Sequence, residues 1–264
     1  MSTSTGPFAG KVIIVTGSSA GVGAATALAL AREGARVVVN CSRTREQAEG
    51  VAAQCRGAGG DAIVVPADVS DDAQCRALAA AAIERWGAID GLVNNAGTTK
   101  FVAAHDLAGL SAADFQSIYA VNVVGPFQMI RACEKALRAA RGAVVNVSSI
   151  AGPDGLGSSV AYASSKGALN TLTIAMSRVM GPEVRVNAVL PGFIETGWLK
   201  AGLGAAYDAV HTGYRSQSAL EAVLSPEDVA DAILWLLAAP KTTGQLLRVD
   251  AGKQIGRGPH ARPL

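Results

Sequence analysis

The chain has 264 residues, of which 50% are hydrophobic and 17% charged, and its formal net charge is +2. This length suffices for the core of one large α/β domain, and no linker-like stretch divides the chain. The basic residues are scattered, so charge gives no support for a role at nucleic acid or at a membrane surface. The start of the chain lacks the regions of a signal peptide, and no apolar run reaches the roughly 18 residues that span a bilayer. We therefore expect a soluble, cytoplasmic protein.

Short β-branched runs alternate along the chain with longer, alanine-rich segments of helical period. Strands are expected at Lys11–Val15, Arg36–Asn40, Ala62–Val65, Gly91–Val93, Ala143–Val147, Arg185–Val189 and Leu246–Val249. Helices are expected at about 22–33, 44–57, 71–86, 111–140, 160–180 and 226–238. This order predicts an α/β fold of one domain, residues 1–264, with a doubly wound, Rossmann-like parallel sheet of about seven strands and helices on both faces.

The segment from Phe193 to Leu220 has no clear period, and unpatterned stretches of this length in compact domains are usually functional or disordered. Two compatible interpretations are open for residues 193–220: a mobile flap that binds the substrate, or an additional small helix that packs on the core. Residues 154–159 would form another wall of the same pocket. The side chains available to line the pocket from the first segment are Trp198, Leu199, Leu203, Tyr207, His211 and Tyr214.

Cysteines and histidines lie far apart, with no CxxC pair and no ligand spacing, so neither a metal site nor a disulfide framework is predicted. These residues are Cys41, Cys55, Cys75, Cys133, His105, His211 and His260.

The stretch TGSSAGVG, Thr16–Gly23, joins the first expected strand to the first expected helix. Its glycines at 17, 21 and 23 would permit a tight turn and close approach of a pyrophosphate to the backbone, beside a helix N-terminus. A tightly packed strand-to-helix turn also favours glycine, so this pattern alone does not decide between a nucleotide site and a structural turn.

Two further patterns carry hydroxyl and amine chemistry. Tyr162 and Lys166 are four residues apart on an expected helix, where a neighbouring ammonium would stabilise phenolate and lower the tyrosine pKa from about 10. Asn146–Ser149 ends the fifth expected strand, where a serine hydroxyl can hydrogen-bond a carbonyl oxygen that gains charge. Each pattern by itself also fits an ordinary amphipathic helix or the start of a loop.

Taken together and in this order, the motifs resemble those of the short-chain dehydrogenase/reductase family, over nearly the whole chain. The overall pattern is nearest to bacterial 3-oxoacyl-carrier-protein reductases. The resemblance implies hydride transfer coupled to proton transfer, with no metal. The matching segments are Thr16–Gly23, Asp68–Val69, Asn94–Gly97, Val121–Val123, Ser149, Tyr162, Lys166 and Pro191–Gly192.

The resemblance also implies a role for each matching residue. Tyr162 would exchange the proton with the substrate oxygen, Lys166 would lower its pKa and hold the nicotinamide ribose, and Ser149, rather than Ser148, would polarise the carbonyl. Asn122 would support a water through which protons reach Lys166. The implied cofactor contacts are Thr16, Gly17, Ser19, Gly21, Val22 and Gly23 in the loop, Asp68 and Val69 at the adenine, Asn94, Asn95, Ala96 and Gly97 on the adenosine side, and Pro191, Gly192, Ile194 and Thr196 at the nicotinamide.

The end of the second expected strand bears on the choice of cofactor. NAD sites usually place an acid there for the ribose 2′-hydroxyl, whereas a 2′-phosphate requires that acid to be missing and a cation to be near. Cys41 stands where the acid would be, and Ser42 and Arg43 follow. We therefore predict NADP(H) over NAD(H), with Ser42 and Arg43 at the phosphate. Arg43 also fits a solvated residue before a helix, and Ala20 stands where many NADP-dependent relatives carry a basic residue.

The predicted function is NADPH-dependent reduction of a ketone or 3-oxoacyl-type carbonyl to a secondary alcohol, with a small carbonyl or alcohol as partner. The alternatives are an NAD-dependent alcohol or sugar dehydrogenase of the same family, and a dinucleotide-binding regulator without turnover, which should lack part of the catalytic set. The resemblance further implies a homodimer or homotetramer built by the helices at 111–140 and 160–180 and by Gly244–Gly252.

Overall fold

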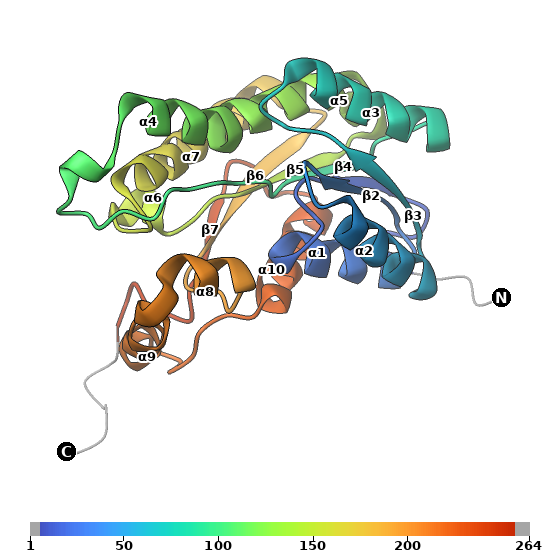
Figure 1. Cartoon of the computed structure of the whole chain (residues 1–264). Helices are drawn as coiled ribbons and strands as arrows, with labels where there is room; N and C mark the ends of the chain where they lie inside the picture. The colour runs from blue at the N-terminus through green and yellow to red at the C-terminus, as the bar shows by residue number, and fades with distance from the viewer. Residues whose placement is uncertain (1–5, 257–264) are drawn as a thin grey trace.

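A single parallel sheet lies between two layers of helices in the computed structural model, which describes residues 6–256 (Figure 1). Its strands are β1 (Val12–Val15), β2 (Arg36–Cys41), β3 (Asp61–Pro66), β4 (Gly91–Asn94), β5 (Ala143–Val147), β6 (Arg185–Pro191) and β7 (Leu246–Val249). Their spatial order is β3-β2-β1-β4-β5-β6-β7, and all adjacent pairs are parallel. The predicted doubly wound fold is confirmed, and the chain order reverses between β1 and β4, where open α/β sheets bind ligands.

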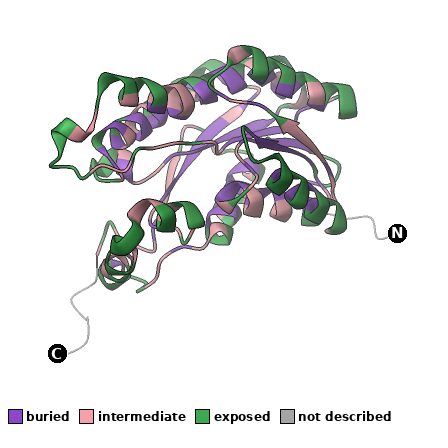
Figure 2. Ribbon diagram, viewed as in Figure 1, coloured by how far each residue is buried: buried purple, intermediate pink, exposed green. Residues whose placement is uncertain are grey.

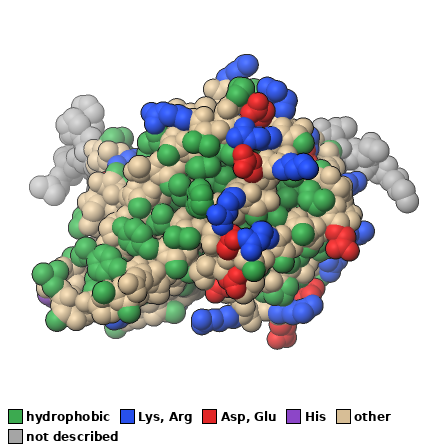
Figure 3. Space-filling model, turned by 90° about the horizontal axis from the view of Figure 1, so that it is seen from above, with side chains coloured by type: hydrophobic (Ala, Val, Ile, Leu, Met, Phe, Trp, Pro, Cys, Tyr) green, Lys and Arg blue, Asp and Glu red, His purple; other side chains and the backbone are tan. Residues whose placement is uncertain are grey.

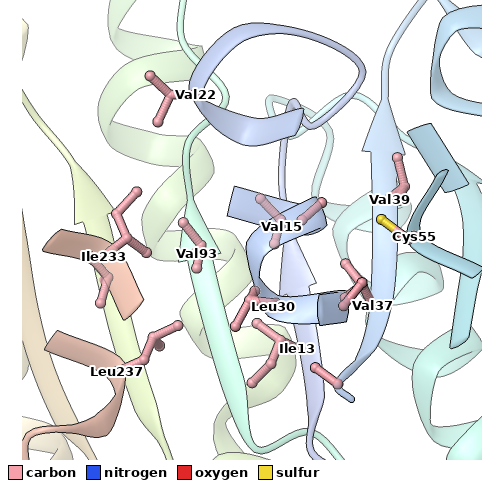
Figure 4. Close-up of a cluster of buried hydrophobic side chains, with 14 of the residues drawn as sticks. Ile13, Val15, Val22, Leu30, Val37, Val39, Cys55, Val93, Ile233 and Leu237 are labelled. Atoms are coloured by element: carbon pink, nitrogen blue, oxygen red, sulfur yellow. The ribbon is translucent and has the colours of Figure 1, made fainter. Parts of the chain in front are cut away.

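Side chains of the central strands alternate between two apolar layers, which is why these strands read as unbroken apolar runs. Ile13 and Val15 pack with helices α1 (Gly21–Arg32), α2 (Arg45–Gly57) and α10 (Pro226–Ala238), and Figure 4 shows part of this cluster. Val12 and Ile14 pack with α3 (Asp72–Trp86), α5 (Gly125–Ala140) and α7 (Val160–Met180) on the other face. Burial therefore concentrates in the sheet and in the helix faces turned toward it (Figure 2).

The single helix expected over 111–140 is wrong in one respect. The segment is divided into α4 (Ala112–Tyr119), a π-helical turn η2 (Ala120–Val124) and α5. Pro126 has no N–H to donate to the carbonyl four residues earlier, at Asn122, which favours a wider turn. Asn122, one of the predicted site residues, lies in this turn and is fully buried.

Residues 193–220 are largely helical, in agreement with the interpretation of an additional helical element. They contain α8 (Gly197–Leu203), the 3₁₀ turn η3 (Gly204–Ala206) and α9 (Tyr207–Gln217), on the same side of the sheet as α10 (Figure 1). None of the helices in residues 6–256 is long and apolar enough to cross a membrane.

Candidate active site

A cleft of about 1470 Å³ runs along the carboxyl ends of the strands. Its wall includes residues at or just after the ends of β1 to β6, which are Gly17, Cys41, Ala67, Asn95, Ser149 and Gly192. Pockets for drug-sized ligands measure roughly 300–1,000 Å³, so this cleft has room for a dinucleotide together with a second molecule.

Most of the predicted site residues line this one cleft. Four do not: Thr16, Gly23, Asn94 and Asn122 are buried behind the wall and hold it in place. The residues in the lining are Gly17, Ser19, Gly21, Val22, Ser42, Arg43, Asp68, Val69, Asn95, Ala96, Gly97, Ser149, Tyr162, Lys166, Pro191, Gly192, Ile194 and Thr196.

The glycine loop is fixed by its own stereochemistry and by two buried polar side chains. Gly17 adopts a φ of 61°, which only glycine takes without strain. The hydroxyl of Thr16 accepts hydrogen bonds from the N–H groups of Asn95 and Ala96, both at 3.0 Å. Asn40 Oδ1 accepts from the N–H of Gly17 at 3.0 Å. Asn40 was not among the predicted site residues, although a polar residue inside an apolar strand was an available signal.

Helix α1 presents its N-terminus to the cleft beside this loop. Its N-cap, Ala20, has no side chain that could bond the first N–H groups, and the first turn carries no acidic residue. Ala20, Gly21 and Val22 all line the cleft. The N–H groups and the positive end of the helix dipole therefore fit a pyrophosphate, as a bound dinucleotide would require.

The end of β2 supplies hydroxyls and a cation to the cleft, and no carboxylate occurs from Arg36 to Thr44. Cys41 is buried, whereas Ser42 and Arg43 are exposed, and all three line the cleft. Within the described residues, the Arg43 side chain has no hydrogen-bond or ion-pair partner. The hydroxyls of Ser19 and Thr44 are hydrogen-bonded at 2.8 Å, which ties the glycine loop to this segment.

Ser149 follows β5, while Tyr162 and Lys166 come from the first two turns of α7. The Ser159 hydroxyl caps α7 by accepting from the N–H of Tyr162 at 3.2 Å. The side chains of Ser149 and Tyr162 are hydrogen-bonded to each other. Ser148 instead donates its hydroxyl to the backbone carbonyl of Lys166 at 3.2 Å. Of the two serines, Ser149 is thus the one whose hydroxyl lies beside the tyrosine.

Burial dominates the titration of the tyrosine and the lysine. It raises the pKa of Tyr162 to about 12, opposed by the hydrogen bond with Ser149, and it lowers the pKa of Lys166 to about 8. Lys166 Nζ lies 5.6 Å from the centre of the Tyr162 ring and donates to the carbonyl oxygen of Val147 at 2.8 Å. Desolvation is thus the largest influence on the Tyr162 pKa, and the lowering expected from Lys166 is not seen in this structure.

The Asn122 side chain joins the loop after β4 to α7. Its Oδ1 accepts from the N–H of Thr98 at 2.8 Å, and its Nδ2 donates to the Thr98 carbonyl and to the Ser165 hydroxyl, both at 3.0 Å. The amide therefore links the loop after β4 to Ser165, the residue before Lys166.

A substitution at Lys166 should show by how much the burial of this charged amine lowers the free energy of unfolding. A lysine whose pKa falls from 10.5 to about 8 on folding is disfavoured by roughly 3 kcal/mol while it is charged. Removal of the ammonium also leaves the Val147 carbonyl unpaired, which offsets part of this gain. We expect Lys166→Met to raise the free energy of unfolding at pH 7 by roughly 1–2 kcal/mol, measured by urea denaturation.

The pH dependence of that difference is the sharper readout. The unfolded chain binds more protons than the folded chain between pH 8 and pH 10.5, so wild-type stability rises with pH relative to the variant. The advantage of Lys166→Met should shrink steadily above pH 8. A difference that does not change between pH 7 and pH 9.5 would show that Lys166 is not buried in its charged form.

The other half of the cleft is lined mainly by apolar side chains. Phe101, which no sequence pattern marked, packs against Trp198 with ring centres 5.6 Å apart. Leu156, Leu199, Leu203 and Val210 line the same region. Asp154, Leu156, Gly157 and Ser158 place the expected wall of residues 154–159 here, beginning in the short helix α6 (Ala151–Asp154).

Two residues expected to line the pocket do not. Tyr207 and His211 are absent from the lining and pack instead on Phe193, with ring centres 5.6 and 5.7 Å away. His211 Nε2 also lies 2.8 Å from Glu195 Oε1. Helix α9 is thereby fastened to the turn after β6. Trp198, Leu199, Leu203 and Tyr214 do line the cleft.

Within residues 6–256, no cluster of three or more His, Cys, Asp or Glu residues could hold a metal ion. His260 lies outside the described residues.

Comparisons with known proteins agree with this geometry. The family model described as short chain dehydrogenase matches residues 11–203. A protein assigned as ketoacyl reductase 2 of the granaticin polyketide synthase in Streptomyces violaceoruber is 44% identical over 245 residues, or 92% of this chain and 96% of that protein. The cis-4-hydroxycyclohexanecarboxylate dehydrogenase of Sinomonas cyclohexanicum is 37% identical over 253 residues, or 93% of this chain and 97% of that protein.

Solved structures lead to the same family. A crystal structure from Burkholderia xenovorans, of a protein assigned as a short-chain dehydrogenase/reductase, superposes with a TM-score of 0.87 at 38% identity, over 94% of this chain and 99% of that one. The NADH-dependent reductase A1-R′ of alginate metabolism superposes with a TM-score of 0.82 at 28% identity, over 93% and 98%. The chain therefore belongs to the short-chain dehydrogenase/reductase family, whose members are NAD(P)-binding oxidoreductases of Rossmann fold that act on CH–OH or C=O groups.

Proposed function

We propose that the protein reduces an apolar or 3-oxoacyl-type ketone to a secondary alcohol with NADPH. The observation that carries this proposal is the convergence of Ser149, Tyr162 and Lys166 on one cleft with the glycine loop. The similarity to a ketoacyl reductase over 92% of the chain supports the direction of reduction.

Each of the three side chains has a distinct task. A bound nicotinamide cofactor supplies the hydride. Tyr162 gives its proton to the substrate oxygen. A phenol with a pKa of about 12 is protonated near neutral pH, and reduction requires this protonated form. Ser149 donates its hydroxyl to the same oxygen as negative charge develops. Lys166 holds the nicotinamide ribose and brings a positive charge beside the phenol, which eases the loss of the proton.

The remaining predicted contacts divide the cleft between cofactor and substrate. We assign the adenine to Asp68 and Val69, the adenosine side to Asn94–Gly97, and the nicotinamide amide to Ile194 and Thr196. The substrate is assigned to residues 193–220 together with the 154–159 wall. Asn122 acts by positioning, since its amide joins Thr98 to α7.

The cofactor assignment depends on Arg43. Loss of a charge-assisted hydrogen bond to a 2′-phosphate should raise the KM for NADPH about tenfold or more. We expect this effect in Arg43→Ala, with the KM for NADH within twofold of wild type. Steady-state rates with both cofactors measure it. Arg45→Ala is the matched control, because Arg45 is exposed, pairs with Glu49 at 3.7 Å and does not line the cleft.

A second candidate function is oxidation of an alcohol with NAD. It is favoured by the similarity to a hydroxycyclohexanecarboxylate dehydrogenase and by the NADH dependence of a structural neighbour. A clear preference of the wild-type protein for NADH would support this candidate and contradict the NADPH assignment. The assay should therefore include both directions of reaction.

We further propose that the protein forms a homodimer or homotetramer. Phe115, Val124 and Phe127 are exposed along α4, η2 and α5, and apolar side chains gather on the face that carries these helices (Figure 3). Exposed apolar patches of this kind commonly mark contacts between proteins. A monomeric mass by light scattering would contradict this proposal.

A further inference from the structure

Two carboxylates in the half of the cleft lined by Phe101, Leu156 and Trp198, the substrate half, are held by basic side chains of the protein. Asp154 accepts from Arg248 of β7 through both of its carboxylate oxygens, at 2.9 and 3.4 Å. Glu195 Oε1 is hydrogen-bonded to His211 Nε2 at 2.8 Å.

Lys253 differs from these two acids. It lines the cleft from the turn after β7 and is partly buried, and within residues 6–256 it has no carboxylate within ion-pair distance. Its Nζ donates to the neutral side-chain oxygen of Gln217 at 2.5 Å and lies 5.7 Å from the centre of the Tyr214 ring. The positive charge is thus held in place by an amide and an aromatic face, neither of which cancels it.

The acid nearest to Lys253 in the sequence, Asp250, is hydrogen-bonded to the backbone of its own turn. Asp250 accepts from the N–H of Gly252 at 2.9 Å through one oxygen and from the N–H of Gln254 at 3.1 Å through the other. These bonds fold the turn that carries Lys253. The N–H of Leu220 also donates to the carbonyl of Ala251 at 3.0 Å, so the turn is fastened to the end of the 193–220 segment.

Tyr214 connects Lys253 to the reaction centre. Its hydroxyl fills the space that a Cβ at Gly192 would need, and its ring packs on Phe193 with centres 5.7 Å apart. The same ring lies beneath the Lys253 ammonium. The Tyr214 side chain therefore lies between the Lys253 ammonium and the turn after β6. The apolar side chains of Phe101, Leu156 and Trp198 line the same half of the cleft.

We propose that the natural substrate is an apolar ketone with an anionic group remote from the carbonyl, and that Lys253 binds this anion. The inference rests on the proposed function for the carbonyl chemistry and adds the substrate class. The partner Gln217 is exposed, so the anion would sit at the rim of the cleft and keep part of its hydration, while the apolar body contacts the aromatic wall. A carboxylate and a phosphate share this chemistry.

Matched pairs of substrates separate charge from shape. The carboxylate pair is 4-oxocyclohexanecarboxylate and its methyl ester; the phosphate pair is acetoacetyl-coenzyme A and acetoacetyl-N-acetylcysteamine. We expect wild-type kcat/KM to favour the anionic member of at least one pair by about tenfold, which corresponds to one charge-assisted hydrogen bond at a partly exposed position. The pair in which the anionic member has the higher kcat/KM shows whether the bound group is a carboxylate or a phosphate.

Variants at position 253 then test whether Lys253 binds the anion. Lys253→Met should raise the KM for the preferred anionic ketone about tenfold, with kcat and the neutral partner within twofold, and Lys253→Arg should restore the low KM. Lys241→Met is the control, because Lys241 is an exposed lysine between α10 and β7 and lies outside the lining. Equal kinetics for charged and neutral partners, or equal losses on both in Lys253→Met, would overturn this inference alone. Failure of the wild type to reduce any of the four ketones would count against the proposed function.

Discussion

Tyr162→Phe is expected to lower the rate of ketone reduction by about 10³-fold while NADPH binds as in the wild type. The substitution removes one oxygen and its proton from a side chain that lines the cleft and is hydrogen-bonded to Ser149. General acid catalysis by a positioned side chain contributes roughly 10²–10⁴-fold. Single-turnover reduction, followed by the loss of NADPH absorbance, measures the chemical step, and the Kd for NADPH by fluorescence titration measures binding.

The ring of Tyr162 should stay in place in this variant, because its position is set by the cap of α7 and by the 5.6 Å contact with Lys166 rather than by the hydroxyl. Tyr119→Phe, on α4 and outside the cleft, is the control for loss of a tyrosine hydroxyl elsewhere. Full turnover by Tyr162→Phe would show that another group donates the proton. A large loss of NADPH affinity would show instead that the hydroxyl serves binding.

The strands and most helices were predictable because their signals are local. Residues 12–15 of β1 are apolar without interruption, which only burial on both faces explains, and capping boxes at Ser111 and Ser225 mark the starts of α4 and α10. The π-turn at Ala120–Val124 was missed because the period of apolar residues does not distinguish one wider turn from an α-helical turn. Pro126, which lies inside the expected helix 111–140, was an available signal of an irregular turn.

The site residues likewise fall into two groups: those that a local sequence pattern reveals, and those that only the complete fold brings together. Glycine spacing and the Tyr162–Lys166 pair can be read from the sequence, since each depends on neighbours within a turn or a helix. The raised pKa of Tyr162 could not be read, because it depends on how deeply the whole fold buries the phenol. Phe101 and Lys253 reach the cleft from loops after β4 and β7, so only the assembled sheet brings them to the substrate half. The role of Arg43 stays a prediction that the cofactor assay must decide.

Gly23→Ala should abolish measurable NADPH binding, with an increase in Kd of more than 100-fold, although it adds a single methyl group. A Cβ at this position would lie 2.5 Å from the carbonyl oxygen of Gly17 and 2.5 Å from Asn95 Nδ2, distances that real Cβ atoms do not adopt. The Gly17 carbonyl is backbone and the Asn95 amide is held by bonds to the carbonyls of Thr16 and Gly17, both at 2.9 Å, so neither can retreat without moving the loop.

The displacement in Gly23→Ala falls on the contact between α1 and the glycine loop, which presents the first N–H groups of the helix to the pyrophosphate. Overpacking of this kind should also lower the free energy of unfolding by roughly 1–3 kcal/mol, so binding must be measured below the unfolding transition. Gly50→Ala is the control: Gly50 is exposed on α2, and a Cβ there would meet nothing within 4 Å. Its alanine should stabilise the helix by up to about 1 kcal/mol and leave the Kd for NADPH unchanged. Wild-type affinity in Gly23→Ala would mean that the loop does not hold the pyrophosphate.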